Sequence, residues 1–405
     1  MGQPSYPLDG YRVVEISQIW AAPQLASSLG DMGAQVMRVE SLMSTDVART
    51  GGADKSEYRV LLDRQRHARS REACITLNIR DPEGMAYFKD LLRTADVFVC
   101  NLSPRVLKKL GLTYEDVRRL RPDIVMVTVS AAGQHGPWSD LVAFGPAMNA
   151  VVGSDLLVGY PGDDVFMSAY WDPDPAMGVA SVYAVLPALY RREETGEGQH
   201  MDMSFSEFLT GFLGEPILEA QMIGRNPTPQ GNRHPWQAPH GIYATSEEDR
   251  WVGITVATDE EWSALCHTIG RGDLTDDDRF DDSAKRVAHR DDLDEIVSAW
   301  TRERTNYEAA EILQHAGVAA CPAFSIAELY HDEHHRFRRT SIKMDETGFD
   351  RDLITYGLSW RLSRTPGAFR RLGQRVGGDN RAFYNAYLGL SCEQIAELEE
   401  GEVFY

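Results

Sequence analysis

The chain has 405 residues, of which 43% are hydrophobic and 25% charged, a composition typical of a folded protein with a substantial core. Acidic residues outnumber basic ones by 61 to 41, and the net charge of -20 argues against nucleic acid or an anionic membrane as a general partner. The 5 scattered cysteines indicate neither a disulfide framework nor a zinc site. No secretory signal is evident, and no apolar run approaches the ~20 residues of a membrane span, so we expect a cytoplasmic protein.

Short strands alternate with helices over the first third of the chain. The residue pattern predicts strands at 11–17, 35–40, 74–77, 96–100 and 124–129, and helices at 24–32, 81–93 and 103–109. This alternation predicts an α/β fold with a largely parallel, doubly wound sheet. No GxGxxG follows the first strand and no P-loop sequence occurs, so the sheet is expected to be Rossmann-like in topology only.

The rest of the chain predicts a second, smaller domain. Residues 178–192 have the pattern of a long apolar helix, whereas 226–241 are rich in Pro, Gly and Asn and predict a loop. We therefore expect a discontinuous large domain of residues 1–220 and 325–405, and a small α/β domain of residues 225–325. Near the end, Ser391 and Gln394 have the spacing of a capping box at the start of a helix.

Five stretches of the sequence resemble the CaiB/BaiF family, the class III CoA-transferases, in the same order and at similar separations. They lie at 8–40, 75–84, 97–112, 190–204 and, near the end, 362–403, and they begin LDGYRVVEIS, ITLNIRDPEG, VFVCNLSPRV, YRREETGEGQ and LSRTPGAF. The resemblance implies CoA thioesters as substrates with no tightly bound cofactor. It also implies a dimer of interlocked rings, built from identical or from homologous subunits.

Asp174 matches the nucleophile of that family, an aspartate four residues before a glycine that opens a helix, here Gly178. A carboxylate just ahead of a helix is kept ionised by the positive field of the helix N-terminus. The alternative is a plain helix N-cap, for which Asp is among the commonest residues. Asp172 is a rival whose spacing to Gly178 does not match the family.

The resemblance implies covalent catalysis. Asp174 attacks the thioester carbonyl of the donor, forming a mixed anhydride and releasing the CoA thiolate. The thiolate returns to the aspartyl carbonyl and gives an aspartyl-CoA thioester, and the acceptor acid then reverses these steps. Neither a metal nor a separate general base is needed, because the carboxylates and the thiolate are already deprotonated.

Further positions match CoA contacts of the family. The resemblance assigns this role to Gln18, Trp20, Ala21, Leu77, Arg80, Asn101, Leu102, Lys109 and Leu110. Trp20 stands where some members carry Gln, which could reshape the acyl pocket. Arg80, Lys109 and their neighbours Arg105 and Lys108 would supply positive charge to the phosphates, unless they are solvated surface residues.

Two departures from relatives bear on the function. Some members close the active site with a run of glycines, whereas residues 231–241 here read GNRHPWQAPHG, so gating by a glycine loop is not carried over. His234 and His240 in that loop, like HDEHH at 331–335, are interpreted as structural rather than metal-binding. Racemases of similar fold use a histidine where this chain has Phe144, which cannot exchange protons. An α-methylacyl-CoA racemase is therefore only the alternative.

The sequence gives less direct information about the acceptor acid than about the type of reaction. The donor in many relatives is succinyl-CoA. The aromatic residues Phe144, Tyr170, Trp171 and Trp236 are predicted to line the substrate pocket, which would suit an acceptor with an aromatic part such as benzylsuccinate. The same residues could instead belong to a core or an interface. A second class of function is a non-catalytic subunit that pairs with a catalytic homologue.

Overall fold

The structure, a computed structural model, describes residues 6–50, 69–165, 167, 173–344 and 353–405. The chain divides into two compact units, each of which is interrupted in sequence by the other. The first comprises Met1–Ser154, Met167–Arg225 and Thr340–Tyr405, and the second Asp155–Phe166 and Asn226–Arg339. The domain limits drawn from the sequence, at 220, 225 and 325, stay a prediction.

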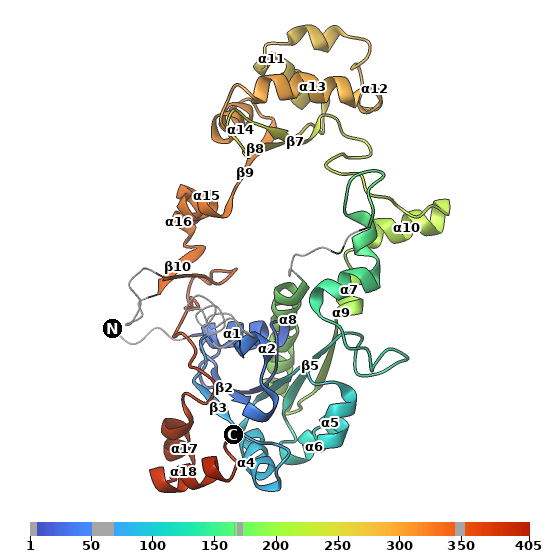
Figure 1. The fold of residues 1–405 in the computed structure, drawn as a ribbon. Helices are drawn as coiled ribbons and strands as arrows, with labels where there is room; N and C mark the ends of the chain where they lie inside the picture. The colour runs from blue at the N-terminus through green and yellow to red at the C-terminus, as the bar shows by residue number, and fades with distance from the viewer. Residues whose placement is uncertain (1–5, 51–68, 166, 168–172, 345–352) are drawn as a thin grey trace. The chain divides into compact units, whose positions relative to one another are not determined.

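A six-stranded parallel sheet forms the centre of the first unit (Figure 1). Its strands are β1 (Arg12–Ile16), β2 (Gln35–Glu40), β3 (Ala73–Thr76), β4 (Val97–Cys100), β5 (Val125–Ser130) and β6 (His200–Ser204). Their order is β3-β2-β1-β4-β5-β6, and every pairing is parallel. The Rossmann-like sheet predicted from the sequence is thereby confirmed. The edge strand β6 was not predicted, because its sequence HMDMS lacks β-branched residues.

Helices cover both faces of this sheet because successive side chains of a strand point to opposite sides. On one face Val13 packs with α1 (Ala21–Asp31), α7 (Gly145–Val152), α8 (Pro173–Thr195) and α9 (Phe205–Thr210). On the other face Val14 packs with α4 (Pro82–Thr94), α5 (Pro104–Leu110), α6 (Tyr114–Leu120), α17 (Asn380–Leu388) and α18 (Cys392–Glu400). The predicted doubly wound arrangement is thus present.

Helices α1 and α8 lie side by side and approach closely at Gly178 (Figure 1). A Cβ atom on Gly178 would lie 2.8 Å from the carbonyl oxygen of Ala21 and 2.7 Å from the Cβ of Gln24. Such distances are shorter than van der Waals contact, so the backbones can come this close only with glycine at position 178. The first turns of the two helices are thereby held against each other.

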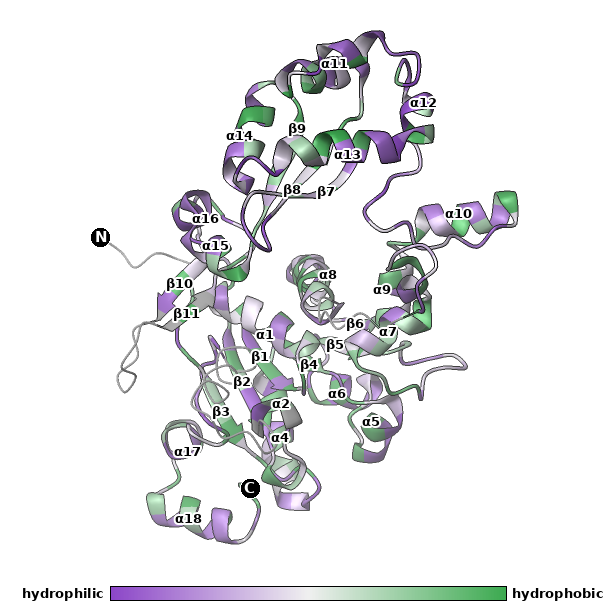
Figure 2. Ribbon diagram, turned by 45° about the horizontal axis from the view of Figure 1, so that its top comes forward, coloured by the Kyte–Doolittle hydropathy of each residue, from purple (hydrophilic) through white to green (hydrophobic). Residues whose placement is uncertain are grey.

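The second unit has a core of its own. Strands β7 (His240–Ala244), β8 (Trp251–Thr255) and β9 (Ala319–Ala323) form an antiparallel sheet in the order β7-β8-β9. It packs with α11 (Asp259–Thr268), α13 (Arg290–Thr301) and α14 (Asn306–His315) around buried residues such as Val252 and Trp262. Figure 2 shows α13 passing from purple at its acidic first turn to greener residues further along the helix.

The remaining elements are short. They are the helices α2 (Val47–Thr50), α10 (Gly214–Ile223), α12 (Ser283–Ala288), α15 (Ile326–His331) and α16 (Glu333–Arg338), the strands β10 (Ser341–Met344) and β11 (Leu353–Tyr356), and single turns at Leu42–Ser44, Ser154–Leu157 and Gly272–Asp276. Within the described ranges, no helix is both long enough and apolar enough to cross a membrane.

Local capping signals predicted helix starts well. The side chain of Asp81 accepts hydrogen bonds from the N–H groups of Glu83 and Gly84, so α4 begins where expected. The capping box of Ser391 and Gln394 is also present at the start of α18. Helix α17, by contrast, was missed. Its buried side chains Asn380 and Tyr384 form hydrogen bonds with the backbone of Thr76, about 300 residues away in sequence. A local sequence pattern does not predict such a distant contact.

Candidate functional site

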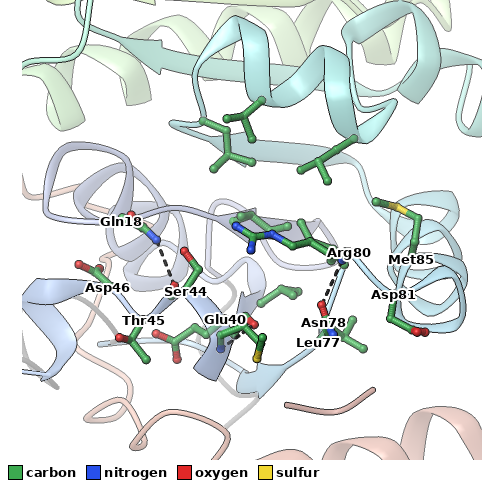
Figure 3. A pocket seen from close by; sticks show the side chains of 18 of the residues that line it. Gln18, Glu40, Ser44, Thr45, Asp46, Leu77, Asn78, Arg80, Asp81 and Met85 are labelled. Atoms are coloured by element: carbon green, nitrogen blue, oxygen red, sulfur yellow. Dashed lines mark hydrogen bonds between the residues drawn. The ribbon is translucent and has the colours of Figure 1, made fainter. Parts of the chain in front are cut away.

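A cavity of about 690 Å³ lies at the carboxyl ends of β1, β2, β3 and β4. Strand order reverses at this point, since β1 pairs with β2 on one side and with β4 on the other. In doubly wound sheets, ligands bind in the crevice at such a reversal. Figure 3 shows Gln18, Ser44 and Asp46 on one side of the pocket, and Asn78, Arg80 and Asp81 on the other.

Buried charges form the floor of the cavity. Arg38 on β2 is 0% exposed, and its guanidinium contacts Glu15 at 2.8 Å, Glu40 at 3.0 Å and Asp46 at 3.3 Å. Glu40 also binds Arg49 at 2.8 Å, and Glu15 binds Arg71 at 2.7 Å. Three carboxylates are thus matched by three guanidinium groups, which allows the charges to be buried.

Burial raises the pKa of Asp46, whereas ion pairing governs the pKa values of Arg38 and Glu40. Burial by itself favours the neutral forms, but Glu15, Glu40 and Asp46 together raise the pKa of Arg38. Burial would raise the pKa of Glu40, yet Arg38 and Arg49 lower it overall. Both groups are therefore charged at neutral pH, and the network is a fixed feature of the cavity.

The turn between β1 and α1 has an uncommon backbone conformation. Ile19 has a φ of 67°, in the left-handed region that β-branched residues rarely adopt. The N–H of Ile19 donates to Asp46 Oδ2 at 3.0 Å. The preceding residue, Gln18, is held on both sides by Asn101, whose Oδ1 accepts from the Gln18 N–H at 2.9 Å and whose Nδ2 donates to the Gln18 carbonyl at 2.7 Å.

The cavity brings together six of the nine residues that the resemblance assigned to CoA. These are Gln18, Leu77, Arg80, Leu102, Lys109 and Leu110. Trp20 and Ala21 instead begin α1, and Asn101 fixes the Gln18 backbone. No described residue forms an ion pair with Arg80 or Lys109, so the charges of both remain available to a ligand. Their contact with CoA stays a prediction.

Asp174 lies in the first turn of α8 and is only 4% exposed. The sequence placed it ahead of a helix that Gly178 opens. In the structure α8 already begins at Pro173, because proline is favoured at the first helical position, so Asp174 is inside the helix and is not its N-cap. Asp172 lies outside the described residues, as do Tyr170 and Trp171.

The carboxylate of Asp174 faces the start of a second helix. A Cβ atom on Gly145, the first residue of α7, would lie 2.5 Å from Asp174 Oδ2. Glycine at 145 therefore leaves room for the carboxylate beside the N-terminus of α7. Two helix N-termini, those of α7 and α8, thus lie beside the same side chain, and each is the positive end of its helix dipole.

The other predicted pocket residues lie in different surroundings. Phe144 is the N-cap residue of α7, directly before Gly145, and is 55% exposed. Trp236 belongs to the second unit, is 60% exposed and packs edge-on against His234 at 4.6 Å between ring centroids. The contact of these aromatic residues with a substrate stays a prediction.

The histidines of the 231–241 loop form an aromatic and hydrogen-bonded cluster. The rings of His234 and His240 are 5.1 Å apart, and Nδ1 of His240 lies 3.2 Å from Oγ1 of Thr255. Burial lowers the pKa of His240, which favours the neutral ring. Across the part of the chain that the structure describes, no group of three or more potential ligands could hold a metal ion.

Sequence reasoning missed Arg38, Glu40 and Asp46, although all three line the cavity. A signal was available in the strand sequence QVMRVE. A charged residue in a central parallel strand, which is covered on both faces, must find a partner of opposite charge. The identity of those partners, Glu15 and Asp46, could not be read from the strand itself.

Comparison with known sequences identifies the family of this doubly wound chain. The profile of CoA-transferase family III matches residues 8–380. The beta subunit of succinyl-CoA–L-malate CoA-transferase of Chloroflexus aurantiacus is 32% identical over 401 residues, covering 98% of both chains. Succinyl-CoA–D-citramalate CoA-transferase of the same organism is 29% identical, covering 99% of both.

Comparison of structures agrees. A CaiB/BaiF family protein from Brucella suis superposes with a TM-score of 0.83 at 27% identity, covering 95% of this chain and 100% of that one. The chain therefore belongs to CoA-transferase family III, and it is a class III CoA-transferase that uses CoA thioesters as substrates.

Proposed function

We propose that the enzyme transfers CoA from succinyl-CoA to a substituted C4 dicarboxylic acid, with Asp174 as the nucleophile. The observation that carries this proposal is the buried Asp174 carboxylate beside the N-termini of α7 and α8. An ionised carboxylate is the attacking form, and backbone N–H groups at helix starts can stabilise the charge that develops on the thioester oxygen.

We propose the covalent route that the resemblance to the family implies. The carboxylate of Asp174 attacks the succinyl thioester, and the C–S bond breaks to give a mixed anhydride and CoA thiolate. The thiolate then attacks the aspartyl carbonyl, releasing succinate and forming an aspartyl-CoA thioester. The acceptor carboxylate attacks this thioester and expels the CoA thiolate, giving a new mixed anhydride. The thiolate then attacks the acceptor's carbonyl, so that the acceptor leaves as its CoA thioester and Asp174 is a free carboxylate again.

The cavity at the carboxyl edge is the proposed binding site for the CoA nucleotide. Its walls combine apolar side chains such as Leu77 and Leu110 with the cations Arg80 and Lys109. Apolar walls suit the adenine ring and the cations suit the phosphates, so the mixture fits a nucleotide thioester.

The names of two relatives support our proposal for the class of acceptor. Their names specify malate and citramalate, which are succinates carrying a hydroxyl group, with or without a methyl group, at carbon 2. Benzylsuccinate, suggested by the aromatic residues of this sequence, is a succinate with a larger apolar substituent at the same carbon. We therefore propose that the acceptor is a succinate substituted at carbon 2. The acceptor panel described next would identify the substituent.

The decisive experiment combines an acceptor panel with trapping of the intermediate. Purified enzyme is supplied with succinyl-CoA and each of malate, citramalate, benzylsuccinate, oxalate and carnitine, and the new CoA thioesters are quantified. Hydroxylamine added with succinyl-CoA should modify Asp174, as peptide mass spectrometry would show. Asp174→Asn should lower the rate at least ~1,000-fold, since removal of a nucleophile typically costs that much or more. An unmodified Asp174, or a variant with full rate, would contradict the mechanism.

The beta-subunit relative gives a second possibility for the assembly. Its name implies that it works with an alpha subunit, so this chain could require a homologous partner. We propose the interlocked dimer of the family for this chain, built from two copies. Inactivity of the pure protein, restored by mixing with a homologous subunit, would instead identify a heteromer. Exchange of the α-proton in deuterated water without an acceptor would support the racemase alternative.

A further inference from the structure

The turn that joins β1 to α1 is held in its conformation by a residue outside the turn. Ile19, with its φ of 67°, is among the described non-glycine residues with a positive φ, and it is the β-branched one among them. Such a conformation costs on the order of 1–3 kcal/mol and persists only where the surroundings enforce it. Strain of this kind is concentrated at functional sites.

Asp46, which lies outside the turn, accepts a hydrogen bond from Ile19. Its Oδ2 accepts the N–H of Ile19 at 3.0 Å and lies 3.3 Å from the guanidinium of Arg38, while its Oδ1 accepts the N–H of Ala48 at 3.0 Å. Arg38 in turn donates to the carbonyl of Ser17 at 3.0 Å. Asp46 is 6% exposed, so these bonds are made with little competition from water.

The turn links the cavity with the helix that carries Asp174. On one side, Gln18 lines the cavity, and its Nε2 donates to the carbonyl of Ser44 at 3.3 Å. On the other side, α1 begins at Ala21, two residues after Ile19, and the carbonyl of Ala21 lies against Gly178 in α8. A different peptide orientation at Ile19 would move the start of α1 and hence its contact with α8.

We infer that Asp46 is a positioning residue for CoA transfer, which holds Ile19 in the left-handed conformation and thereby sets the place of the cavity relative to Asp174. This inference rests on the proposed roles of Asp174 and of the cavity. Asp46 acts on the turn through its hydrogen bond to the backbone N–H of Ile19. Its loss should slow the chemical step more than it weakens the binding of CoA.

The test compares Asp46→Ala with the wild-type enzyme at saturating succinyl-CoA. The turnover number kcat should fall about tenfold, equivalent to ~1.4 kcal/mol. The Kd of free CoA should change less than about threefold, because most of the cavity wall comes from other segments. Asp46→Asn, which keeps one acceptor oxygen, should give a smaller loss. Asp90→Ala, which removes an exposed carboxylate on α4, is the control and should keep the wild-type rate.

Substitutions at Ile19 give the specific readout. Glycine adopts a positive φ without cost, whereas alanine does not. In the Asp46→Ala background, Ile19→Gly should therefore restore kcat to within about threefold of wild type, and Ile19→Ala should not. A merely structural or electrostatic role of Asp46 would make the two substitutions equivalent, because both remove the same side chain and neither replaces the lost charge.

Several outcomes would overturn the inference. These are a wild-type kcat in Asp46→Ala, equal effects of glycine and alanine at position 19, or a loss confined to the Kd of CoA. If Asp46→Ala does not fold, the same comparison is made in Asp46→Asn. Failure of the proposed nucleophile is recognised separately, because Asp174→Asn would then remain active while the glycine-specific rescue could still be observed.

Discussion

Helix α8 has ionisable residues of opposite kinds at its two ends. Asp174 lies in the first turn, beside α1 and the carboxyl edge of the sheet. Arg192 lies near the last residue and binds Asp96 at 2.8 Å and Asp123 at 2.6 Å, residues that precede β4 and β5. The helix dipole is positive at its N-terminus and negative at its C-terminus. A carboxylate at the start and a guanidinium at the end are therefore both favourably placed.

Charged residues have different roles at the amino ends and at the carboxyl ends of the parallel strands, which we call the amino edge and the carboxyl edge of the sheet. At the amino edge, Arg192 is matched by Asp96 and Asp123, and none of the three lines the large cavity. At the carboxyl edge, Arg38 is matched by carboxylates that do line it, while Arg80 and Lys109 face it without an ion pair to any residue the structure describes. Ion pairs thus lie at both ends of the strands, and at the carboxyl ends Arg80 and Lys109 are placed to meet a ligand in the cavity.

Among the variants that compare the two ends of the strands, Gly145→Ala is expected to have the largest effect on kcat. The new Cβ would lie 2.5 Å from Asp174 Oδ2 and would displace the carboxylate. A shift of about 1 Å in a reacting group can cost roughly 100-fold in rate, and we expect a loss of that order in kcat. Gly214→Ala on α10 is a matched control, because a Cβ there meets no atom within 4 Å. Steady-state kinetics of both variants, with unfolding midpoints, would show whether space at Gly145 matters.

An intermediate effect should distinguish ligand-binding cations from structural ones. The double variant Arg80→Ala/Lys109→Ala should raise the Kd of CoA about tenfold and leave the unfolding midpoint nearly unchanged, since exposed cations contribute little to stability. Arg192→Ala should leave the Kd of CoA nearly unchanged. It should lower the free energy of unfolding by about 2 kcal/mol, because it leaves Asp96 and Asp123 without their main partner. Calorimetric titration with CoA and denaturant unfolding test both. Equal effects on the Kd would remove the distinction between the edges.

The smallest effect concerns acid stability. Burial opposes ionisation of Glu40, but Arg38 and Arg49 lower its pKa overall, so it stabilises the fold above the ordinary carboxyl pKa and loses this contribution as the pH falls through the lowered value. The same sign holds for Asp123, where burial is outweighed mainly by Arg192. Stability measured from pH 6 downward should fall less steeply in Glu40→Gln than in the wild type.

Asp123→Asn is the comparison variant for that experiment. Its side chain is 29% exposed against 7% for Glu40, so solvent screens its ion pair more. The change of slope should therefore be smaller in Asp123→Asn. A larger change of slope in Asp123→Asn would mean that the Asp123–Arg192 ion pair contributes more to acid sensitivity than the ion pairs of Glu40.

The sequence by itself determined the α/β class, the parallel sheet and the starts of helices such as α4 and α18, because these depend on local periodicity and capping. Asp81 before Pro82 and the box of Ser391 and Gln394 are examples, and both are present in the structure. It also singled out Asp174 by its spacing to Gly178, although it gave no hint that Gly145 makes room for that carboxylate.

The tertiary structure alone decided which polar groups meet. Asn101 holds Gln18 across 83 residues of sequence, and Asp46 holds Ile19 across 27. Neither pairing has a periodic pattern, because each depends on strand order and on where a loop returns to the sheet. Burial then makes these few bonds strong, since water cannot replace a lost partner there. The conformation of the turn at Ile19 is therefore a property of the folded unit, which the residues of the turn do not encode by themselves.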